Sequence, residues 1–234
     1  MPKLLVLIRH PEAEKNVLQR FSRSDGGEAV TKEGRRQSDA LVASFRSLVD
    51  GLDRSFGASI AVHSAATVRS VSTAEVLAGQ LGCTLERHDG LMPISAGSLA
   101  GLTEDAARSE APAFSRALEL YRAGVLSSYR IPGYGESVQQ FEARVANAVD
   151  SILCRTEPIQ LVVAHRSPIT ATLIRFARTT LDYPTAFYGY IELDLGGISA
   201  LLCEGNRAEW VGVNKSPTDA AALLVPIVAS LATP

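Results

Sequence analysis

The 234-residue chain has little cysteine, no excess of basic residues and no long hydrophobic run. Its three cysteines, Cys83, Cys154 and Cys203, are odd in number and far apart, which is typical of small buried apolar side chains rather than of disulfides or metal ligands. Lys and Arg together number 23 against 25 for Asp and Glu, so the formal net charge is −2. A nucleic-acid-binding protein would normally show a basic excess. Any affinity for anions must therefore come from local clusters of Arg and His.

The apolar stretches are too short to span a membrane or to form the core of a signal peptide. The first covers residues 4–8 and ends at Arg9, and the second, 220–232, contains Pro226. We therefore expect a cytoplasmic protein that binds neither a membrane nor nucleic acid. The apolar C-terminal segment, 216–234, is expected to be helical and either to dock on the body of the protein or to support a homodimer.

Strand and helix patterns alternate along the chain. Short apolar runs are typical of strands buried on both faces of a parallel sheet, and apolar residues at helical spacing indicate amphipathic helices. Strands are expected at 4–8, 59–62, 83–86, 159–164, 188–195, 198–203 and 209–213, with a hairpin turn at Gly196-Gly197, and helices at 31–48, 67–81, 113–123, 137–155 and 168–178. This order predicts a three-layer α/β/α fold with a largely parallel central sheet.

No Gly/Ser-rich linker divides the chain, so residues 1–234 are expected to form one domain. The stretch 89–134 interrupts the alternation of strands and helices, because glycine and proline recur throughout it. We interpret this stretch as an inserted cap or lid. Specificity for a substrate is expected to lie there.

Basic side chains follow three of the expected strands at the point where each strand ends. Arg9 and His10 follow the first strand, Arg69 follows the second at the start of a helix, and His165 follows the fourth. Because ligands of open α/β sheets bind beyond the carboxyl ends of the strands, we expect these four side chains to converge. Such a cluster is an anion site, since guanidinium groups match phosphate oxygens and helix N-termini add backbone donors. A phosphoryl group is the expected ligand.

The arginines would also lower the pKa of the imidazoles. A neighbouring cation lowers the pKa of a histidine and therefore helps to keep the ring neutral and nucleophilic. A neutral imidazole can attack phosphorus and form a covalent intermediate. The second imidazole and the guanidinium groups would then stabilise charge on the transferring phosphoryl oxygens.

Five segments carry a recognisable pattern in a fixed order. They are Leu7-Ile8-Arg9-His10-Pro11-Glu12-Ala13-Glu14-Lys15-Asn16, Val30-Thr31-x-x-Gly34-x-x-Gln37, Ser64 through Arg69 followed by Thr73-Ala74, Gly135-Glu136-Ser137 with Arg144 downstream, and Val162-Val163-Ala164-His165. This ordered set resembles the histidine phosphatase superfamily, the phosphoglycerate mutase-like group. The resemblance implies a phosphoglycerate mutase-like fold.

The resemblance also implies a role for each residue of the expected site. His10 would be the nucleophile that becomes phosphohistidine. Arg9 and Arg69 would bind the phosphate, and His165 would complete the pocket. Asn16 and Arg20 would be outer members of the site. Glu136 and Arg166 are further candidates for substrate binding, apart from the resemblance. The family needs no metal or organic cofactor for phosphatase chemistry, so none is expected.

One family position is changed in a way that bears on catalysis. The family usually has Leu-x-Glu-x-x-x-Gly-x-x-x-Gly, in which the glutamate protonates the leaving alkoxide. The frame from Leu91 to Gly101 is intact, and the acid position is Pro93. Loss of a positioned acid typically costs ~10²–10⁴-fold for a poor leaving group. The reaction is therefore expected to be slow, to favour acidic leaving groups, or to use another acid, with Glu136 and Glu104 as candidates.

Glycine usually follows each catalytic histidine of the family, and here Pro11 and Arg166 do. Pro11 removes a backbone donor near the phosphate and holds His10 in an extended conformation. Arg166 adds a cation close to His165. That cation either binds a second anionic group of the substrate or points into solvent.

The two remaining histidines are expected to lie outside the catalytic machinery. His63 lies at the end of the second strand. We expect it to be a buried structural histidine with its hydrogen bonds satisfied, rather than a residue that contacts a ligand. His88 is expected to be exposed in a polar loop.

Three functions fit this pattern. The leading one is a phosphomonoesterase that hydrolyses a small phosphorylated metabolite through phospho-His10. A phosphomutase of this family would carry the acid that Pro93 replaces, so that function is disfavoured. A non-catalytic member that binds phosphorylated ligands or a partner protein is favoured by the missing acid and opposed by the retained histidines and arginines.

Overall fold

The computed structural model describes residues 2–23, 26–49, 59–122, 131–180, 191–204 and 207–232. Over these residues the chain forms one six-stranded sheet and eight α-helices. The strands are β1 (Lys3–Arg9), β2 (Ile60–Ala65), β3 (Leu85–His88), β4 (Ile159–Ala164), β5 (Ile198–Glu204) and β6 (Arg207–Lys215). The α-helices are α1 (Glu14–Val17), α2 (Lys32–Val49), α3 (Val68–Leu81), α4 (Glu104–Glu110), α5 (Pro112–Arg122), α6 (Val138–Leu153), α7 (Arg166–Thr180) and α8 (Pro217–Ala232), and two 3-10 turns are η2 (Asp89–Leu91) and η3 (Gly97–Leu99).

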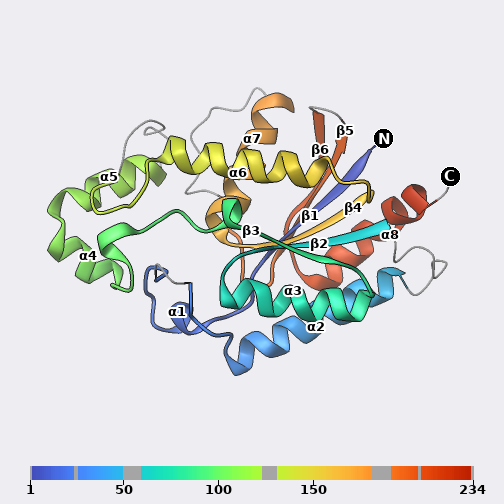
Figure 1. Ribbon diagram of the computed structural model, residues 1–234, viewed down its shortest axis with the longest axis horizontal. Helices are drawn as coiled ribbons and strands as arrows, with labels where there is room; N and C mark the ends of the chain where they lie inside the picture. The colour runs from blue at the N-terminus through green and yellow to red at the C-terminus, as the bar shows by residue number, and fades with distance from the viewer. Residues whose placement is uncertain are drawn as a thin grey trace.

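The sheet has the strand order β3-β2-β4-β1-β5-β6. The pairs β1–β4, β2–β4 and β2–β3 are parallel, whereas β5 and β6 pair in the antiparallel sense. Strands of a parallel sheet are covered on both faces, and β2 and β4 are buried along their whole length. The carboxyl ends of β1, β2 and β4 meet at one edge of the sheet (Figure 1). The predicted three-layer fold with a largely parallel sheet is confirmed.

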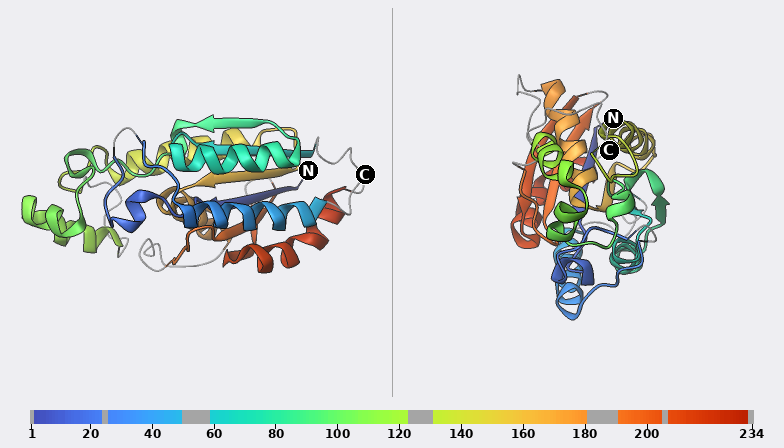
Figure 2. Two further views of the ribbon diagram at one scale, coloured as in Figure 1. Left: turned by 90° about the horizontal axis from the view of Figure 1, so that it is seen from below. Right: turned by 90° about the vertical axis from the view of Figure 1, so that its left-hand side faces the viewer.

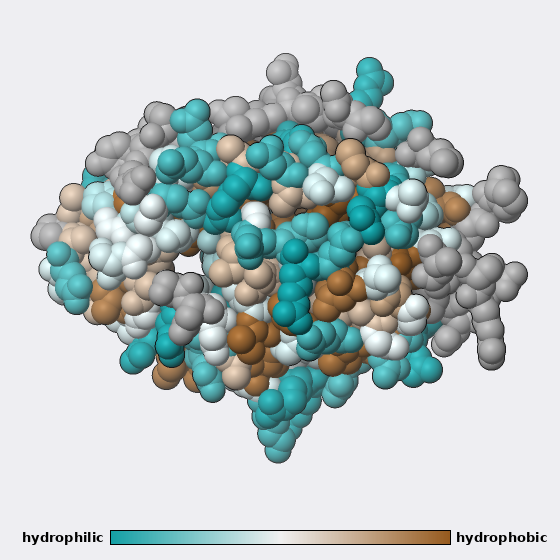
Figure 3. All heavy atoms as spheres, in the orientation of Figure 1, coloured by the Kyte–Doolittle hydropathy of each residue, from teal (hydrophilic) through white to brown (hydrophobic). Residues whose placement is uncertain are grey.

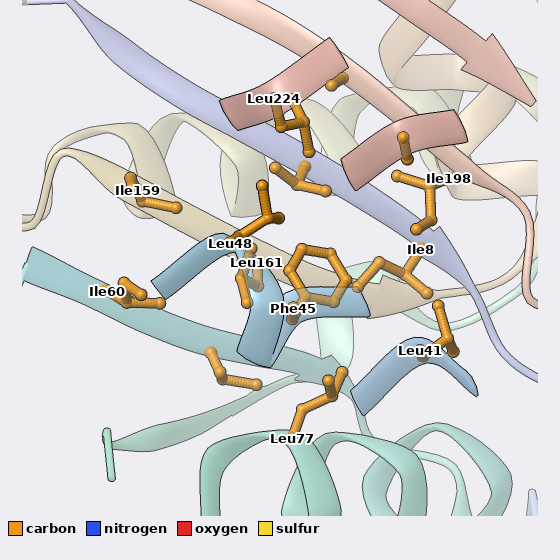
Figure 4. Close-up of a cluster of buried hydrophobic side chains, with 14 of the residues drawn as sticks. Ile8, Leu41, Phe45, Leu48, Ile60, Leu77, Ile159, Leu161, Ile198 and Leu224 are labelled. Carbon is orange, nitrogen blue, oxygen red and sulfur yellow. The ribbon is translucent and has the colours of Figure 1, made fainter. Parts of the chain in front are cut away.

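Helices cover both faces of the sheet. α2, α3 and α8 lie on one face, and α6 and α7 lie on the other (Figures 1 and 2). On the first face Leu41, Phe45 and Leu48 recur at helical spacing along α2 and are buried against the strands (Figure 4). On the second face Phe141 and Val145 of α6 do the same. Full burial of a large apolar side chain stabilises the fold by roughly 1.5–3 kcal/mol, so these two clusters hold the layers together.

The strand expected over 188–195 is wrong in its described part. Residues 191–195 form no strand, and the remainder lies outside the described residues. The turn at Gly196-Gly197 exchanges backbone hydrogen bonds with Arg9 at the end of β1 and closes no hairpin there. Leu193 is buried in the core beside that turn. In residues 191–195 the alternation of apolar and polar residues therefore reflects the burial of single side chains and not pairing with a strand of the sheet.

The helix expected at 113–123 is confirmed as α5, while α4 was not expected. α4 and α5 lie beyond the carboxyl edge of the sheet (Figure 1). They surround a separate apolar cluster that includes Leu99, Phe114, Ile131 and Tyr134. The interpretation of 89–134 as an inserted cap or lid stays a prediction.

The apolar C-terminal segment forms the expected helix, α8, which packs on α2 and on β6. None of the helices in the described ranges is both long enough and apolar enough to cross a membrane. A cytoplasmic location and a homodimer stay predictions.

The first turn of α2 holds the loop that follows β1. Thr31 caps α2 by accepting a hydrogen bond from Gly34 N (3.0 Å), and its hydroxyl donates to Glu12 Oε1 (2.6 Å). Gln37 Oε1 accepts from Glu12 N (2.8 Å). Gly34 is required because a Cβ there would lie 2.0 Å from the carbonyl oxygen of Glu12. The Thr31-x-x-Gly34-x-x-Gln37 pattern therefore fixes the chain just after His10.

Replacing Gly34 by alanine is expected to lower the free energy of unfolding by about 1–3 kcal/mol, the usual cost of overpacking. The added methyl group would push against a backbone carbonyl that two hydrogen-bonded neighbours hold in place. Gly79→Ala is the matched control, because a Cβ at Gly79 in α3 meets nothing within 4 Å and alanine favours a helix by up to ~1 kcal/mol. Urea unfolding followed by circular dichroism compares the two. Equal stability of the two variants would contradict this assignment.

Candidate active site

His10 lies directly after β1 and is held by the neighbouring strand and by its own loop. Its backbone N–H donates to the carbonyl oxygen of Ala164 in β4 (2.9 Å). Its Nδ1–H donates to the carbonyl oxygen of Pro11 (2.7 Å). A carbonyl oxygen can only accept, so Nδ1 carries the proton and Nε2 keeps its lone pair. The residue is 2% exposed, so this lone pair is shielded from bulk solvent.

The guanidinium of Arg69, in the first turn of α3, lies between two imidazoles. It donates from Nε to His10 Nε2 (3.3 Å) and from Nη2 to His165 Nδ1 (3.3 Å). A guanidinium has donors only, so both ring nitrogens act as acceptors and are unprotonated. The ring centroids of the two histidines are 5.0 Å apart. One arginine therefore connects the ends of two strands that are far apart in sequence.

The second imidazole is oriented by the cap of α3. Thr67, the N-cap residue, accepts from the backbone N–H of Ser70. His165 follows β4, and because its Nδ1 accepts from Arg69, its Nε2–H donates to Thr67 Oγ1 (3.2 Å). The same helix start thus supplies both the guanidinium and the hydroxyl that set this ring.

Both imidazoles are neutral at pH 7. Burial holds the pKa of His10 well below its ordinary value, and the nearby charge of Arg69 lowers it further. Burial likewise holds the pKa of His165 well below its ordinary value, with His10 and Arg69 adding to the effect. The expectation that neighbouring arginines favour neutral rings is therefore met, although desolvation is the larger cause.

Two residues that the sequence alone did not identify hold Arg69 in place. Glu28 Oε2 accepts from Arg69 Nη1 (2.7 Å), and Ser22 Oγ accepts from Nη2 (3.0 Å). The side chains of Arg69 and Glu28 are 0% and 7% exposed. A charge buried this deeply requires a hydrogen-bonded counter-charge. Nothing in the sequence distinguishes Glu28 from the nearby Asp25 as the partner of a buried charge.

Two further cations face the histidines. Arg9 donates from Nη1 to the carbonyl oxygen of Leu193, and its buried Nε has no hydrogen-bond partner among the described residues. Burial, followed by Arg166, lowers the pKa of Arg9 to about 10. Lys15, on α1, was also missed, and burial, followed by Arg69, lowers its pKa to about 8. Lys15 could have been identified from the sequence, because it lies in the same segment as Arg9 and His10.

A pocket of about 320 Å³ at the carboxyl edge of the sheet is lined by both histidines, Arg9 and Lys15, but not by the buried Arg69. The surface is hollowed between the α4–α5 region and the body of the protein (Figure 3). Cations on the pocket surface include Arg20 and Arg166, so Arg166 faces the pocket. The remaining surface is mainly apolar and includes Phe21, Leu118 and Tyr134.

Pro93 and Glu104 also line this pocket, whereas Asn16 and Glu136 do not. Asn16 instead caps α1, because its Oδ1 accepts from the backbone N–H of Ala13 (3.1 Å). The pocket thus receives one of the two carboxyl groups that the sequence offered as substitutes for the missing acid.

Glu136 is engaged by a structural ion pair. It accepts from Arg144 Nε (2.9 Å) and Nη2 (2.6 Å), and from the backbone N–H of Ser95 (2.7 Å). The same arginine donates to the carbonyl oxygens of Gly90 and Met92. This pair therefore ties the start of α6 to the segment that carries the proline.

The fold is that of a three-layer α/β/α protein, and its pocket at the carboxyl edge of the sheet is lined by two imidazoles and several cationic side chains. The chain belongs to the histidine phosphatase superfamily, branch 1, whose family model matches residues 5–216. The family resemblance of the five sequence segments is thereby confirmed. A search of curated proteins finds no match.

Solved structures share the fold over most of the chain. Phosphoserine phosphatase from Entamoeba histolytica, a mutant in complex with phosphoserine, is 17% identical, with a TM-score of 0.70 and coverage of 92% of this chain and 98% of that one. Mycobacterial glucosyl-3-phosphoglycerate phosphatase with VO3 is 21% identical, with a TM-score of 0.69 and coverage of 92% and 100%. The alpha-ribazole phosphatase of Shigella flexneri is 20% identical, with a TM-score of 0.73 and coverage of 91% and 96%. At these identities the likeness shows the fold.

Replacing Glu28 by glutamine is expected to lower the free energy of unfolding by roughly 3–5 kcal/mol, because it leaves the buried charge of Arg69 without its counter-charge. Glu75→Gln is the matched control. Glu75 pairs with Arg87 at 3.0 Å, but both side chains are more than half exposed, and such pairs contribute about 0–1 kcal/mol. Chemical unfolding measures both variants. Similar losses at the two sites would refute a dependence on the buried pair.

Proposed function

We propose that the chain is a phosphomonoesterase that hydrolyses a small phosphorylated metabolite through a phosphohistidine on His10. The observation that carries this proposal is the unprotonated Nε2 of His10, a residue that lines the pocket, 3.3 Å from the guanidinium Nε of the fully buried Arg69. A neutral imidazole beside a fixed guanidinium combines a nucleophile with a group that holds phosphoryl oxygens. The fold neighbours named above are phosphatases, which supports the same class of reaction.

The reaction proceeds in two displacements at phosphorus. First, His10 Nε2 forms a bond to phosphorus while the ester P–O bond breaks, and the leaving oxygen takes up a proton. Water then attacks the phosphohistidine, the N–P bond breaks, and the proton of the water passes to the base left by the first step. The ring returns to its neutral form, and alcohol and inorganic phosphate are released.

Donors around His10 would hold the phosphoryl oxygens during both steps. Arg69 donates to both imidazoles, so an oxyanion beside the two rings would lie within reach of the same N–H groups. Arg9 offers a buried Nε with no partner among the described residues. Arg20 and Arg166 on the pocket surface favour a substrate with a second anionic group.

We propose that Lys15 supplies the proton that the family takes from the glutamate replaced here by Pro93. Lys15 lines the pocket, and its charge acts on both His10 and His165. Glu104 also lines the pocket, but it pairs with Arg108 at 2.5 Å. An ammonium group with a pKa of about 8 is protonated at pH 7 and close enough to that pH to donate efficiently.

Wild-type protein is expected to hydrolyse p-nitrophenyl phosphate, and His10→Ala is expected to lose this turnover because the nucleophile is gone. Acid-labile, base-stable phosphate on the wild type identifies the phosphohistidine. The released phenolate is followed by absorbance. Binding of phosphate without turnover of aryl or alkyl phosphates would refute the enzyme proposal and favour a binding protein.

Lys15→Met is expected to lower kcat/KM for alkyl phosphates at least ~10-fold more than for p-nitrophenyl phosphate, because only a poor leaving group needs the acid. With wild type, alkyl turnover should fall as the pH rises through about 8, where the ammonium loses its proton. Aryl turnover should fall less.

Glu104→Gln is the comparison that identifies the acid. If Glu104 were the proton donor, this variant and not Lys15→Met would lose alkyl turnover selectively. If Lys15 only bound phosphate, Lys15→Met would lower both turnovers by the same factor. Initial rates on the two substrate classes, measured from mildly acidic to alkaline pH, distinguish these outcomes.

A further inference from the structure

We infer that His63, Glu86 and His88 form a binding site for a divalent transition-metal ion, with Zn²⁺ as the expected occupant, at the β2–β3 edge of the sheet. The parallel pairing of these strands places Glu86 beside His63. His88 lies two residues further along β3 and therefore on the same face. This proposal is independent of the proposed phosphatase reaction, because none of the three residues lines the catalytic pocket.

The three possible ligand atoms have the spacing of a metal site. His63 Nδ1 lies 2.9 Å from His88 Nε2, and Glu86 Oε2 lies 3.8 Å from each of these nitrogens. The point equidistant from the corners of this triangle is about 2.1 Å from each atom. Bonds from Zn²⁺ to imidazole nitrogen and to carboxylate oxygen are ~2.0–2.2 Å long. An ion at this point would therefore meet the bond lengths of all three ligands.

Outer hydrogen bonds orient two of these ligands. Gln160 turns its amide nitrogen to the carbonyl oxygen of Glu157, so its Oε1 accepts from His63 Nε2–H (2.7 Å). His63 Nδ1 must then carry the lone pair. Arg155 binds Glu86 Oε1 (2.8 Å) and leaves Oε2 for the ion. Partners that fix the tautomer of a histidine and the rotamer of a carboxylate are typical of metal sites.

The exposure of the ligands provides an entry path and an open coordination position. The side chain of His63 is fully buried, whereas those of His88 and Glu86 are 15% and 37% exposed. The expectation of an exposed His88 in a polar loop is therefore wrong, because His88 ends β3 and is partly buried. An ion at the equidistant point lies in the plane of the three ligand atoms. A small displacement toward the outer side would leave a fourth position to water, as in tetrahedral zinc sites.

Metal binding requires one proton to move within the site. In the metal-free arrangement His88 Nε2–H donates to His63 Nδ1. The ion takes both lone pairs when the proton of His88 moves from Nε2 to Nδ1, so no proton need be released. A hydrogen bond between the two rings explains the nitrogen pair, but Glu86 Oε2 at 3.8 Å is too far from either nitrogen for a hydrogen bond. A bridging ion accounts for all three atoms.

The test uses the full chain in a His10→Ala background, which removes an imidazole of the catalytic pocket as a competing ligand. Co²⁺ is titrated into this protein, and its d–d absorption reports tetrahedral coordination. We expect one Co²⁺ per chain, displaced by Zn²⁺. Adding His88→Gln or Glu86→Gln should weaken the affinity at least ~10-fold, and Zn²⁺ should raise the melting temperature only when all three ligands are present.

Glu86→Gln changes a partly exposed side chain and keeps its volume, so it tests the site even if His88→Gln unfolds. Glu75→Gln, an exposed position of α3, is the control and should bind Co²⁺ like the background protein. Unchanged Co²⁺ affinity in Glu86→Gln, or no tetrahedral absorption in the background protein, would overturn the proposal.

Discussion

The candidate site depends on one buried cation. Arg69 has no solvent-exposed side-chain surface and is held by Glu28 and Ser22. Because a guanidinium can only donate, each imidazole that touches it must present a lone pair. Arg69 therefore fixes which nitrogen of each ring carries the lone pair, burial keeps both rings neutral, and the lone pair of His10 is present without a separate general base.

This arrangement explains why the site lies at the start of α3. Thr67 begins the helix and orients one histidine, and Arg69 follows in its first turn and contacts both. The N-terminus of a helix carries partial positive charge and free N–H groups. The two strand ends that supply the histidines are already adjacent, because β1 and β4 pair in parallel up to Arg9 and Ala164. A phosphoryl group at this edge would thus meet side-chain and backbone charge of the same sign.

Local patterns in the sequence predict some parts of the molecule and fail for others. Buried runs such as 159–164 identify strands correctly, and the spacing of Leu41, Phe45 and Leu48 identifies a helix face. The strand expected at 188–195 shows the limit, because its described part, 191–195, forms no strand although Leu193 is buried as in a paired strand. Contacts between distant segments leave no local mark at all: Glu28 meets Arg69 across 41 positions, and nothing in the sequence around Glu28 identifies it as the partner of a buried charge. Glu136 is the opposite case. The sequence motif suggested that it could act as an acid, but its carboxylate forms a structural ion pair with Arg144.

The excess of positive charge in the pocket also determines which kind of acid can work there. Nearby cations lower the pKa of any titratable group. In a carboxyl group this effect favours the ionised form, which has no proton to give, so burial must oppose it wherever a glutamate serves as the acid in such a pocket. An ammonium group becomes more useful instead, because its pKa falls from far above neutrality toward it. Burial acts on Lys15 in the same direction as the arginines, so burial and charge together bring the pKa of its ammonium group toward neutrality, as the proposed proton donor requires.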